Sequence, residues 1–301
     1  MKPIVLAFTQ TGNFPIGFRR VRQAAWQQNL SALGIFGGGE QFAFIDFGPI
    51  NASEATLAIE RDGIRIGSVD LKDWTALLSP DAGARKAAVL ANASHVRSLV
   101  DVGVKVFLSV LTPADPAKSR QENFAFAVES YTSLSVAAAE CGAKIVLEGA
   151  PGRPPHFPNL GCTPADLVAF FEAVPSPAIG INFDPSHLVR MGIDPVRFVH
   201  QFGKRIFHAH AKDTLILPEA QYQHGNLQQA TFAEPHIYGG FGWRYALPGK
   251  GNVKWNELLA ALVDAQYAGG ISIELEDADY LGDEAAERRG LIEARRFLQQ
   301  A

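Results

Sequence analysis

The sequence predicts an α/β chain folded as a (β/α)8 barrel, and three observations support this prediction. Short apolar segments alternate with longer helix-like segments eight times along the 301 residues, a pattern typical of a parallel sheet with helical crossovers. An open doubly wound sheet usually carries a glycine-rich phosphate turn after its first strand. Here the first predicted strand runs into Thr9–Gly12 with no G-x-G-x-x-G pattern. The length also suits a barrel of about 250 residues with an insertion.

Each predicted strand is a short run of mostly apolar residues. In chain order these runs are Pro3–Phe8, Gln41–Phe47, Ile64–Val69, Lys105–Leu111, Ala143–Glu148, Ala178–Asp184, Arg205–Ala211 and Gly270–Leu275. Gly37–Gly39 precedes the second strand rather than following one, so we interpret it as a loop.

The segments between the strands are longer and predict helices. Thr163 suits an N-cap, because Pro164 then occupies the first helical position, where proline is favoured. The other predicted helices are Phe18–Leu33, Ala52–Arg61, the alanine-rich Gly83–Val102, Glu122–Cys141, Asp194–Gln201 and the charged Asp283–Gln300.

The composition excludes several classes of protein. Hydrophobic residues make up 47% and charged residues 19% of the chain, which is too apolar for a disordered protein. The formal charge of −4 offers no general attraction to nucleic acid or to an anionic membrane. No apolar run approaches the roughly 18 residues of a membrane span, and Met1–Gln10 lacks a signal-peptide cleavage pattern. We therefore expect a cytoplasmic enzyme with no nucleic-acid and no membrane partner.

The two cysteines, Cys141 and Cys162, form no Cys-x-x-Cys pair, which argues against a disulfide framework and a thiolate zinc site. No linker or low-complexity tract divides the chain, so we expect one domain over residues 1–301. The interval between the seventh and eighth strands is about twice the roughly 30 residues of one strand–helix unit. We assign the surplus to 212–253, an aromatic-rich segment expected to serve as a lid or as a contact in a homo-oligomer. Its aromatic residues are Tyr222, His224, Phe232, His236, Tyr238, Phe241, Trp243 and Tyr245.

Four polar residues close successive predicted strands from the fifth onward. In a (β/α)8 barrel, functional side chains lie at the carboxyl ends of the strands. Three carboxylates and one imidazole suit one divalent ion, with Mn²⁺ preferred and Mg²⁺, Co²⁺ and Zn²⁺ as alternatives. Taken singly, each residue also has a structural explanation, such as an ion pair, a turn cap or a buried histidine. The four metal-ligand candidates are Glu148, Asp184, His210 and Glu274.

Further candidates lie near these strand ends. His208 shares a strand face with His210 and is expected deeper in the barrel, as a hydrogen-bonding partner rather than a ligand. Lys212 continues that face, and the next residue, Asp213, is expected to orient it. The substrate-binding candidates are His187, Arg244, Lys212 and Trp74. Structural roles as a solvated arginine, a core tryptophan or a structural lysine remain open.

Four segments carry a resemblance to a known family. NFDPSHL (182–188), RIFHAHAKDT (205–214), ALPGKGNVKW (246–255) and GISIELED (270–277) resemble the sugar phosphate isomerase/epimerase family of xylose isomerase-like TIM barrels. The match is concentrated between Ala143 and Asp277. The resemblance implies that the four strand-end residues bind a metal ion and that His187 lies close to substrate or metal. It also implies that Glu148 and Glu274 act as catalytic acid/base groups.

Two departures from the family pattern bear on function. Ala150 stands where many relatives carry a polar residue, so substrate recognition there differs, and Arg153 or His156 is a candidate to fill the space. The endonuclease relatives use a D-x-H segment, and none occurs in this chain. Together with the negative charge, its absence disfavours phosphodiester cleavage in DNA.

The function expected from this combination is a divalent-metal-dependent isomerase or epimerase of sugars or keto-sugars. Glutamate-mediated proton transfer through a metal-stabilised enediolate would carry the reaction. A lyase or dehydratase acting on a keto-polyol or keto-glycoside is the alternative, because the same enediolate can lose a β-hydroxyl. A non-catalytic barrel is a third interpretation, disfavoured by the intact set of four ligand candidates. The expected partner is a small-molecule carbohydrate substrate.

Overall fold

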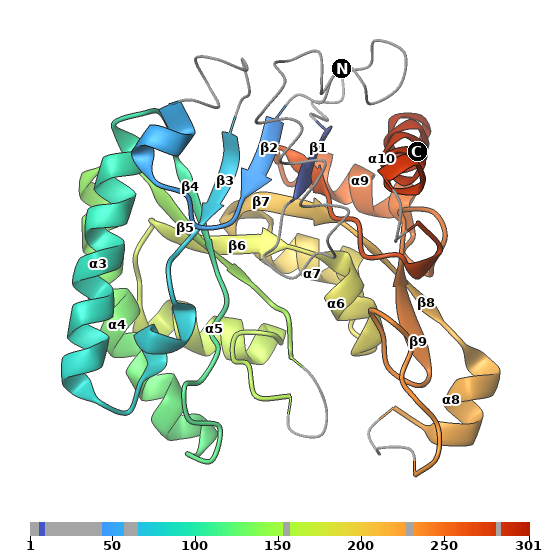
Figure 1. The fold of residues 1–301 in the computed structure, drawn as a ribbon, viewed down its shortest axis with the longest axis horizontal. Coiled ribbons are helices and arrows are strands. Elements are labelled where there is room, and N and C mark those ends of the chain that lie inside the picture. The colour runs from blue at the N-terminus through green and yellow to red at the C-terminus, as the bar shows by residue number, and fades with distance from the viewer. Residues whose placement is uncertain (1–5, 10–43, 57–65, 153–156, 227–230, 281–283) are drawn as a thin grey trace.

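Eight parallel strands close a barrel in the computed structural model, which describes residues 6–9, 44–56, 66–152, 157–226, 231–280 and 284–301 (Figure 1). The strand order around the barrel is β1-β10-β7-β6-β5-β4-β3-β2, and β1 pairs with both β10 and β2. The predicted (β/α)8 barrel is therefore confirmed. The barrel strands are β1 Leu6–Thr9, β2 Phe44–Phe47, β3 Ile66–Asp70, β4 Val106–Ser109, β5 Lys144–Glu148, β6 Ile179–Phe183, β7 Ile206–Ala211 and β10 Ile271–Ile273.

Most predicted helices are confirmed with small shifts of their ends. Ser119 and Glu122 form a capping box at the start of α4, and Thr163 caps α5 with Pro164 at the first position. Residues 52–56 are helical, whereas Phe18–Leu33 and the end of the predicted helix Ala52–Arg61 lie outside the described residues. The confirmed helices are α3 Ala82–Val100, α4 Arg120–Glu140, α5 Pro164–Ala173, α7 Pro195–Phe202 and α10 Glu284–Gln300.

Several elements have no counterpart in the sequence prediction. Between β7 and β10 the chain forms β8 Asp213–Ile216, α8 Pro218–His224 and β9 Trp243–Ala246, and β8 pairs antiparallel with β9. The segment 212–253 is thus built on a β-hairpin, which Figure 1 shows extending from the barrel beside α6. The prediction also lacked α6 Pro185–Arg190, α9 Trp255–Asp264 and the short 3-10 helices η1 Trp74–Leu78, η2 Gly203–Arg205 and η3 Ala278–Tyr280. Among the described residues, no helix combines the length and apolar character that a membrane crossing requires.

Alternation along the strands separates an apolar outer layer from a polar interior. On β5, β6, β7 and β10, the residues packed in the hydrophobic core include Ile145, Ile181, Ala209 and Ile273. Because successive side chains of a strand point to opposite faces, the intervening residues face the barrel interior. Those intervening residues include Glu148, Asn182, His208, His210, Ser272 and Glu274.

An irregularity between β6 and β7 sets the direction of the two β7 histidines. Ile181 pairs with Ile206, but the next residue of β6, Asn182, pairs with His208. One extra residue of β7, Phe207, therefore lies between the two pairs, as in a β-bulge. The shift places His208 and His210 on the same side as Asn182, inside the barrel.

Asp213 anchors the hairpin to the chain that follows it. Its carboxylate accepts hydrogen bonds from the backbone N–H groups of Thr214, Gly249 and Val253 and from the indole Nε1 of Trp255, at 2.8–3.1 Å. A Cβ at Gly251 would lie 2.3 Å from Asp213 Oδ1, so only glycine leaves room for the carboxylate. The segment GKGNVKW (249–255) thus wraps the buried carboxylate of Asp213, whose hydrogen bonds serve this loop and not Lys212.

We expect Asp213→Ala to lower the free energy of unfolding by about 3 kcal/mol, because it leaves several buried donors without an acceptor. Urea unfolding at an unchanged m-value measures the loss. Asp194→Asn is the matched control, since Asp194 caps α7 and asparagine caps helices equally well. Equal stability of the two variants would contradict this role of Asp213.

Candidate active site

The four predicted ligand residues lie at the carboxyl ends of four neighbouring strands. Glu148 ends β5, Asp184 follows β6, His210 lies near the end of β7 and Glu274 follows β10. All four are buried, and each offers a ligand atom within 4.8 Å of the others. The structure therefore brings together one imidazole and three carboxylates at the mouth of the barrel.

Asp184 has both a structural and a site-facing oxygen. Its Oδ1 accepts a hydrogen bond from the backbone N–H of Ser186 at 2.8 Å and caps α6. Its Oδ2 makes no hydrogen bond within the described part of the chain and lies 3.2 Å from Lys212 Nζ and 3.3 Å from His187 Nε2. The turn-capping role and the site role are thus divided between the two oxygens.

His210 points its two ring nitrogens at carboxylates on opposite sides. Nδ1 lies 3.2 Å from Glu274 Oε2 and 3.5 Å from Glu148 Oε1, and Nε2 lies 3.7 Å from Asp46 Oδ2. Neither nitrogen makes a hydrogen bond in the portion of the protein described. Burial disfavours the imidazolium form, but the surrounding carboxylates outweigh burial and hold the pKa of His210 well above its ordinary value.

Lys212 supplies a buried positive charge beside the ligand candidates. Its Nζ lies 2.7 Å from Glu274 Oε2, 2.8 Å from Glu276 Oε2 and 3.2 Å from Asp184 Oδ2. Burial lowers the pKa of Lys212, but the three carboxylates outweigh it and raise this pKa well above its usual range. The same ammonium lowers the pKa of Glu274 against the effect of burial.

His187 joins Glu148 to the hairpin. Its Nε2 lies 3.1 Å from Glu148 Oε1, and its Nδ1 lies 2.6 Å from the hydroxyl of Tyr245 on β9. Burial raises the pKa of the Glu148 carboxyl, but His210 and His187 outweigh burial and hold it well below the ordinary value. His187 is thus a direct neighbour of the four residues.

Asp46 and Asp70, at the ends of β2 and β3, are site residues that the sequence prediction did not include. Asp46 Oδ2 lies 2.7 Å from His208 Nε2, so His208 has the hydrogen-bonding place expected for it. Asp70 is buried, and burial together with the charges of Glu148 and Asp46 raises its pKa well above the ordinary value. The signal was available in both cases, because Asp70 directly follows the predicted strand Ile64–Val69 and Asp46 is the penultimate residue of the predicted strand Gln41–Phe47.

Two further residues lie at the site although the periodicity of the strands does not predict them there. Glu276 follows β10 by three residues, and burial and Glu274 raise its pKa to about 7 against the effect of Lys212. Tyr245 comes from the β8–β9 hairpin, whose pairing the sequence prediction lacked.

The structure does not bring Arg244 and Trp74 to the four-residue cluster. Arg244 binds Asp277 Oδ1 at 2.9 Å and Asp279 Oδ2 at 2.7 Å, which ties the hairpin to the segment after β10. Trp74 lies on η1, donates its indole N–H to the carbonyl of Leu71 and packs against the hydrophobic core. Arg153 and His156 lie outside the described residues.

The chemistry of the cluster fits a divalent cation. Buried polar atoms are normally hydrogen-bonded, yet Asp184 Oδ2 and His210 Nδ1 make no hydrogen bond among the residues described. Both atoms face the same group of carboxylate oxygens. One imidazole nitrogen with carboxylate oxygens is a donor set typical of Mn²⁺, Zn²⁺ and related ions. Glu148, Asp184, His210 and Glu274 would hold such an ion.

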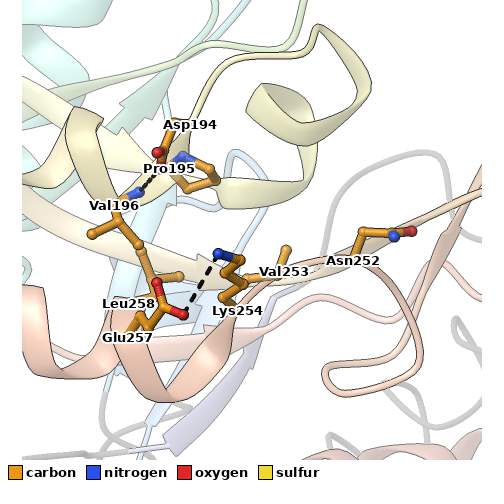
Figure 2. A pocket seen from close by; sticks show the side chains of 8 residues that line it. All are labelled: Asp194, Pro195, Val196, Asn252, Val253, Lys254, Glu257 and Leu258. Carbon is orange, nitrogen blue, oxygen red and sulfur yellow. Dashed lines mark hydrogen bonds and ion pairs between the residues drawn. The ribbon is translucent and has the colours of Figure 1, made fainter.

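A separate pocket of about 140 Å³ lies between the starts of α7 and α9 (Figure 2). Its acidic side chains are already engaged, because Asp194 caps α7 and Glu257 pairs with Lys254. None of the four candidate ligands lines it. We therefore place the chemistry at the strand ends and not in this pocket.

The fold and the site define a (β/α)8 barrel with a carboxylate and imidazole cluster at its carboxyl end. Residues 27–301 match the family model of the xylose isomerase-like TIM barrel. The chain belongs to this family, which confirms the resemblance seen in the sequence.

Two curated relatives illustrate the range of the family. YfiH of Bacillus subtilis strain 168 is 31% identical over 154 residues, which cover 50% of this chain and 46% of YfiH. An inosose dehydratase of Bacillus thuringiensis strain Al Hakam is 23% identical over 221 residues, 73% of this chain and 66% of that protein. The chain thus spans about half to two thirds of the length of these relatives.

Three solved structures share the fold. A D-psicose 3-epimerase has a TM-score of 0.69 at 16% identity, with 99% of both chains covered. The mannonate dehydratase of Streptococcus suis serotype 2 has a TM-score of 0.69 at 14% identity and covers 99% of this chain and 93% of its own. The IolI protein, solved with a zinc atom, has a TM-score of 0.66 at 18% identity and 99% of both chains covered.

We expect Arg244→Ala to lower the free energy of unfolding by about 2 kcal/mol, because fully buried Asp277 loses its charged partner. Urea unfolding measures the change, and Arg97→Ala, which removes an exposed pair with Glu140, should cost far less. A raised KM with unchanged stability would instead support the substrate-gripping role predicted from the sequence.

Proposed function

We propose that this protein is a divalent-metal-dependent isomerase or epimerase of a small sugar or keto-sugar, with Mn²⁺ as the preferred ion. The observation that carries the proposal is the buried group of Glu148, Asp184, His210 and Glu274, whose ligand atoms lie within 4.8 Å of one another. When bound, the ion supplies Lewis-acid polarisation of a substrate carbonyl and its adjacent hydroxyl. Asp184 and His210 would serve only to hold it.

Glu148 and Glu274 are the proposed proton carriers. In the barrel, β5 and β10 are separated by β6 and β7, so the two glutamates approach the cluster from different strands around the rim. A carboxylate that removes a proton next to a carbonyl acts as general base, and a second one can return the proton from another direction. Return to the same carbon gives epimerisation, and return to the neighbouring carbon gives aldose–ketose isomerisation.

Each glutamate is oriented by a different donor. His187 Nε2 lies 3.1 Å from Glu148 Oε1, and Lys212 Nζ donates to Glu274 Oε2 at 2.7 Å. These contacts fix one oxygen of each carboxylate, which restricts the direction in which the other oxygen points. Fixed orientation of the acid and base is one of the main sources of rate enhancement in proton transfer.

Dehydration of a keto-polyol is the second candidate function. The relatives named inosose dehydratase favour it, because the one from Bacillus thuringiensis matches 73% of this chain. The same enediolate that epimerises can lose a hydroxyl from the next carbon if an acid protonates the leaving oxygen. The ammonium of Lys212, which donates to Glu274, is the candidate acid for that step.

Metal binding gives the first test. We expect purified protein to hold about one divalent ion per chain and to gain about 4 kcal/mol of stability at a free-ion concentration a thousand times the Kd. Glu274→Gln and His210→Ala should lose both effects while keeping their circular dichroism spectra. Glu140→Gln, at an exposed ion pair, is the control. Undiminished metal content in both site variants would refute the ligand assignment.

Solvent deuterium separates the candidate reactions. With Mn²⁺-loaded protein and a panel of ketoses, aldoses and keto-polyols, we expect deuterium at the carbon next to the carbonyl together with formation of an isomer or epimer. Glu148→Gln should lower the exchange rate at least a hundredfold, as expected for loss of a general base. A product lighter by one water would assign the dehydratase function, and no exchange with any substrate would contradict both functions.

A further inference from the structure

Tyr245 reaches the site from a part of the sequence far from the strand ends. It lies on β9, and its hydroxyl is 2.6 Å from Nδ1 of His187 on α6. Both side chains are buried. The hairpin between β7 and β10 therefore contributes a polar group directly to the surroundings of the candidate ligands.

The ring of Tyr245 is held from several sides. Its centroid lies 5.0 Å from that of Trp243 and 5.5 Å from that of His187, with the histidine ring edge-on at 75°. The ammonium of Lys212 lies 4.5 Å and the guanidinium of Arg190 5.6 Å from the ring centroid, at cation–π distances. Its backbone is fixed by pairing with Thr214 of β8. The hydroxyl therefore has a well-defined position.

The surroundings of His187 determine which ring nitrogen carries hydrogen. Nε2 lies 3.1 Å from Glu148 Oε1 and 3.3 Å from Asp184 Oδ2. The contact with Glu148 is a hydrogen bond, and an ionised carboxylate oxygen only accepts hydrogen bonds, so Nε2 is the protonated nitrogen. In a neutral imidazole the other nitrogen, Nδ1, then carries a lone pair. The hydroxyl of Tyr245 donates its hydrogen bond to this lone pair. His210 Nδ1, by contrast, makes no hydrogen bond among the described residues.

We propose that Tyr245 is a positioning residue that holds His187 in its Nε2–H tautomer, which makes His187 a hydrogen-bond donor at the sugar site and not a metal ligand. An imidazole binds a metal ion through a nitrogen lone pair. Here Nε2 carries hydrogen and the lone pair of Nδ1 is taken by Tyr245, so neither nitrogen is available. This inference rests on the proposed function and narrows the predicted role of His187 from substrate or metal to substrate alone.

The hydrogen-bond donor role has a chemical use in the proposed reaction. An N–H group beside the Glu148 carboxylate can donate to an oxygen of a bound sugar on the same side of the site. The donor acts without moving a proton itself, so its effect is to orient substrate and base. The hairpin, through Tyr245, would thereby set the substrate geometry at one of the two glutamates.

Nitrogen NMR of histidine-labelled protein tests the tautomer directly. In the wild type we expect the Nδ1 resonance of His187 at the position of an unprotonated, hydrogen-bonded ring nitrogen and Nε2 at that of an N–H nitrogen. A His187→Asn variant identifies the two signals. In Tyr245→Phe the Nδ1 signal should move, because its hydrogen-bond donor is lost. A protonated Nδ1 in the wild type, or an unchanged Nδ1 in the variant, would overturn the proposal.

Metal content and kinetics separate positioning from structural damage. We expect Tyr245→Phe to bind the same amount of Mn²⁺ as wild type and to lower kcat about tenfold, with a smaller change in KM. Tyr131→Phe is the matched control, because Tyr131 is fully buried and its hydroxyl contacts only Ser109 among the hydrogen bonds described. The control should leave kcat and the His187 signals unchanged. A loss of kcat as large in the control as in Tyr245→Phe would overturn the positioning role.

The NMR result is independent of the proposed function, so failure of one can be distinguished from failure of the other. If the protein binds no metal and exchanges no deuterium, the isomerase proposal fails while the tautomer of His187 is still read from the spectrum. If metal and exchange are present but Nδ1 is protonated, the role of Tyr245 fails and the isomerase proposal stands.

Discussion

Compensation of buried negative charge is the constraint on which this site depends. The strand ends and the segments after them bury carboxylates from β2, β3, β5, β6 and β10 around one opening. Isolated charges in such a place would cost several kcal/mol each. Lys212 compensates part of this negative charge, because its ammonium contacts Asp184, Glu274 and Glu276. His210 lies between carboxylates on both sides. The carboxylates outnumber these neighbouring cations, and a divalent cation would compensate the remaining negative charge.

The two residues after β7, Lys212 and Asp213, connect this charge balance to the hairpin and to the loop before α9. Lys212 points its ammonium to the site, whereas the next residue, Asp213, turns its carboxylate to the loop before α9. Adjacent residues on an extended chain point in opposite directions, so one short segment serves both purposes. The hairpin begins at Asp213, and its second strand then returns Tyr245 to the site. The position of Tyr245 therefore depends on the same turn that fixes Lys212.

The sequence alone was informative about the barrel because its predicted strands are short, mostly apolar runs, several of which end in polar residues. Glu148, Asp184, His210 and Glu274 could be placed together since strand ends of a parallel barrel meet at one rim. Asp46 and Asp70 follow the same rule and were accessible to the same argument. Tyr245 was not, because its place depends on a hairpin register between β8 and β9 that no periodicity in this segment indicates. Arg244 directly precedes Tyr245 on β9, so its side chain points to the opposite side of the hairpin. There it contacts Asp277 and Asp279.

The two glutamates end up in unequal surroundings, and this inequality bears on how one barrel site can support related reactions. Glu148 is contacted by the imidazole of His187, which is in turn held by a neutral tyrosine hydroxyl. Glu274 is contacted by an ammonium that also binds Glu276. Proton removal, proton return and loss of a hydroxyl require the same enediolate but differ in which donor faces the leaving or receiving atom. In the proposed function, the four metal-ligand candidates serve all of these outcomes alike. We therefore assign the choice between them to the donors beside each glutamate, His187 held by the hairpin and Lys212 after β7.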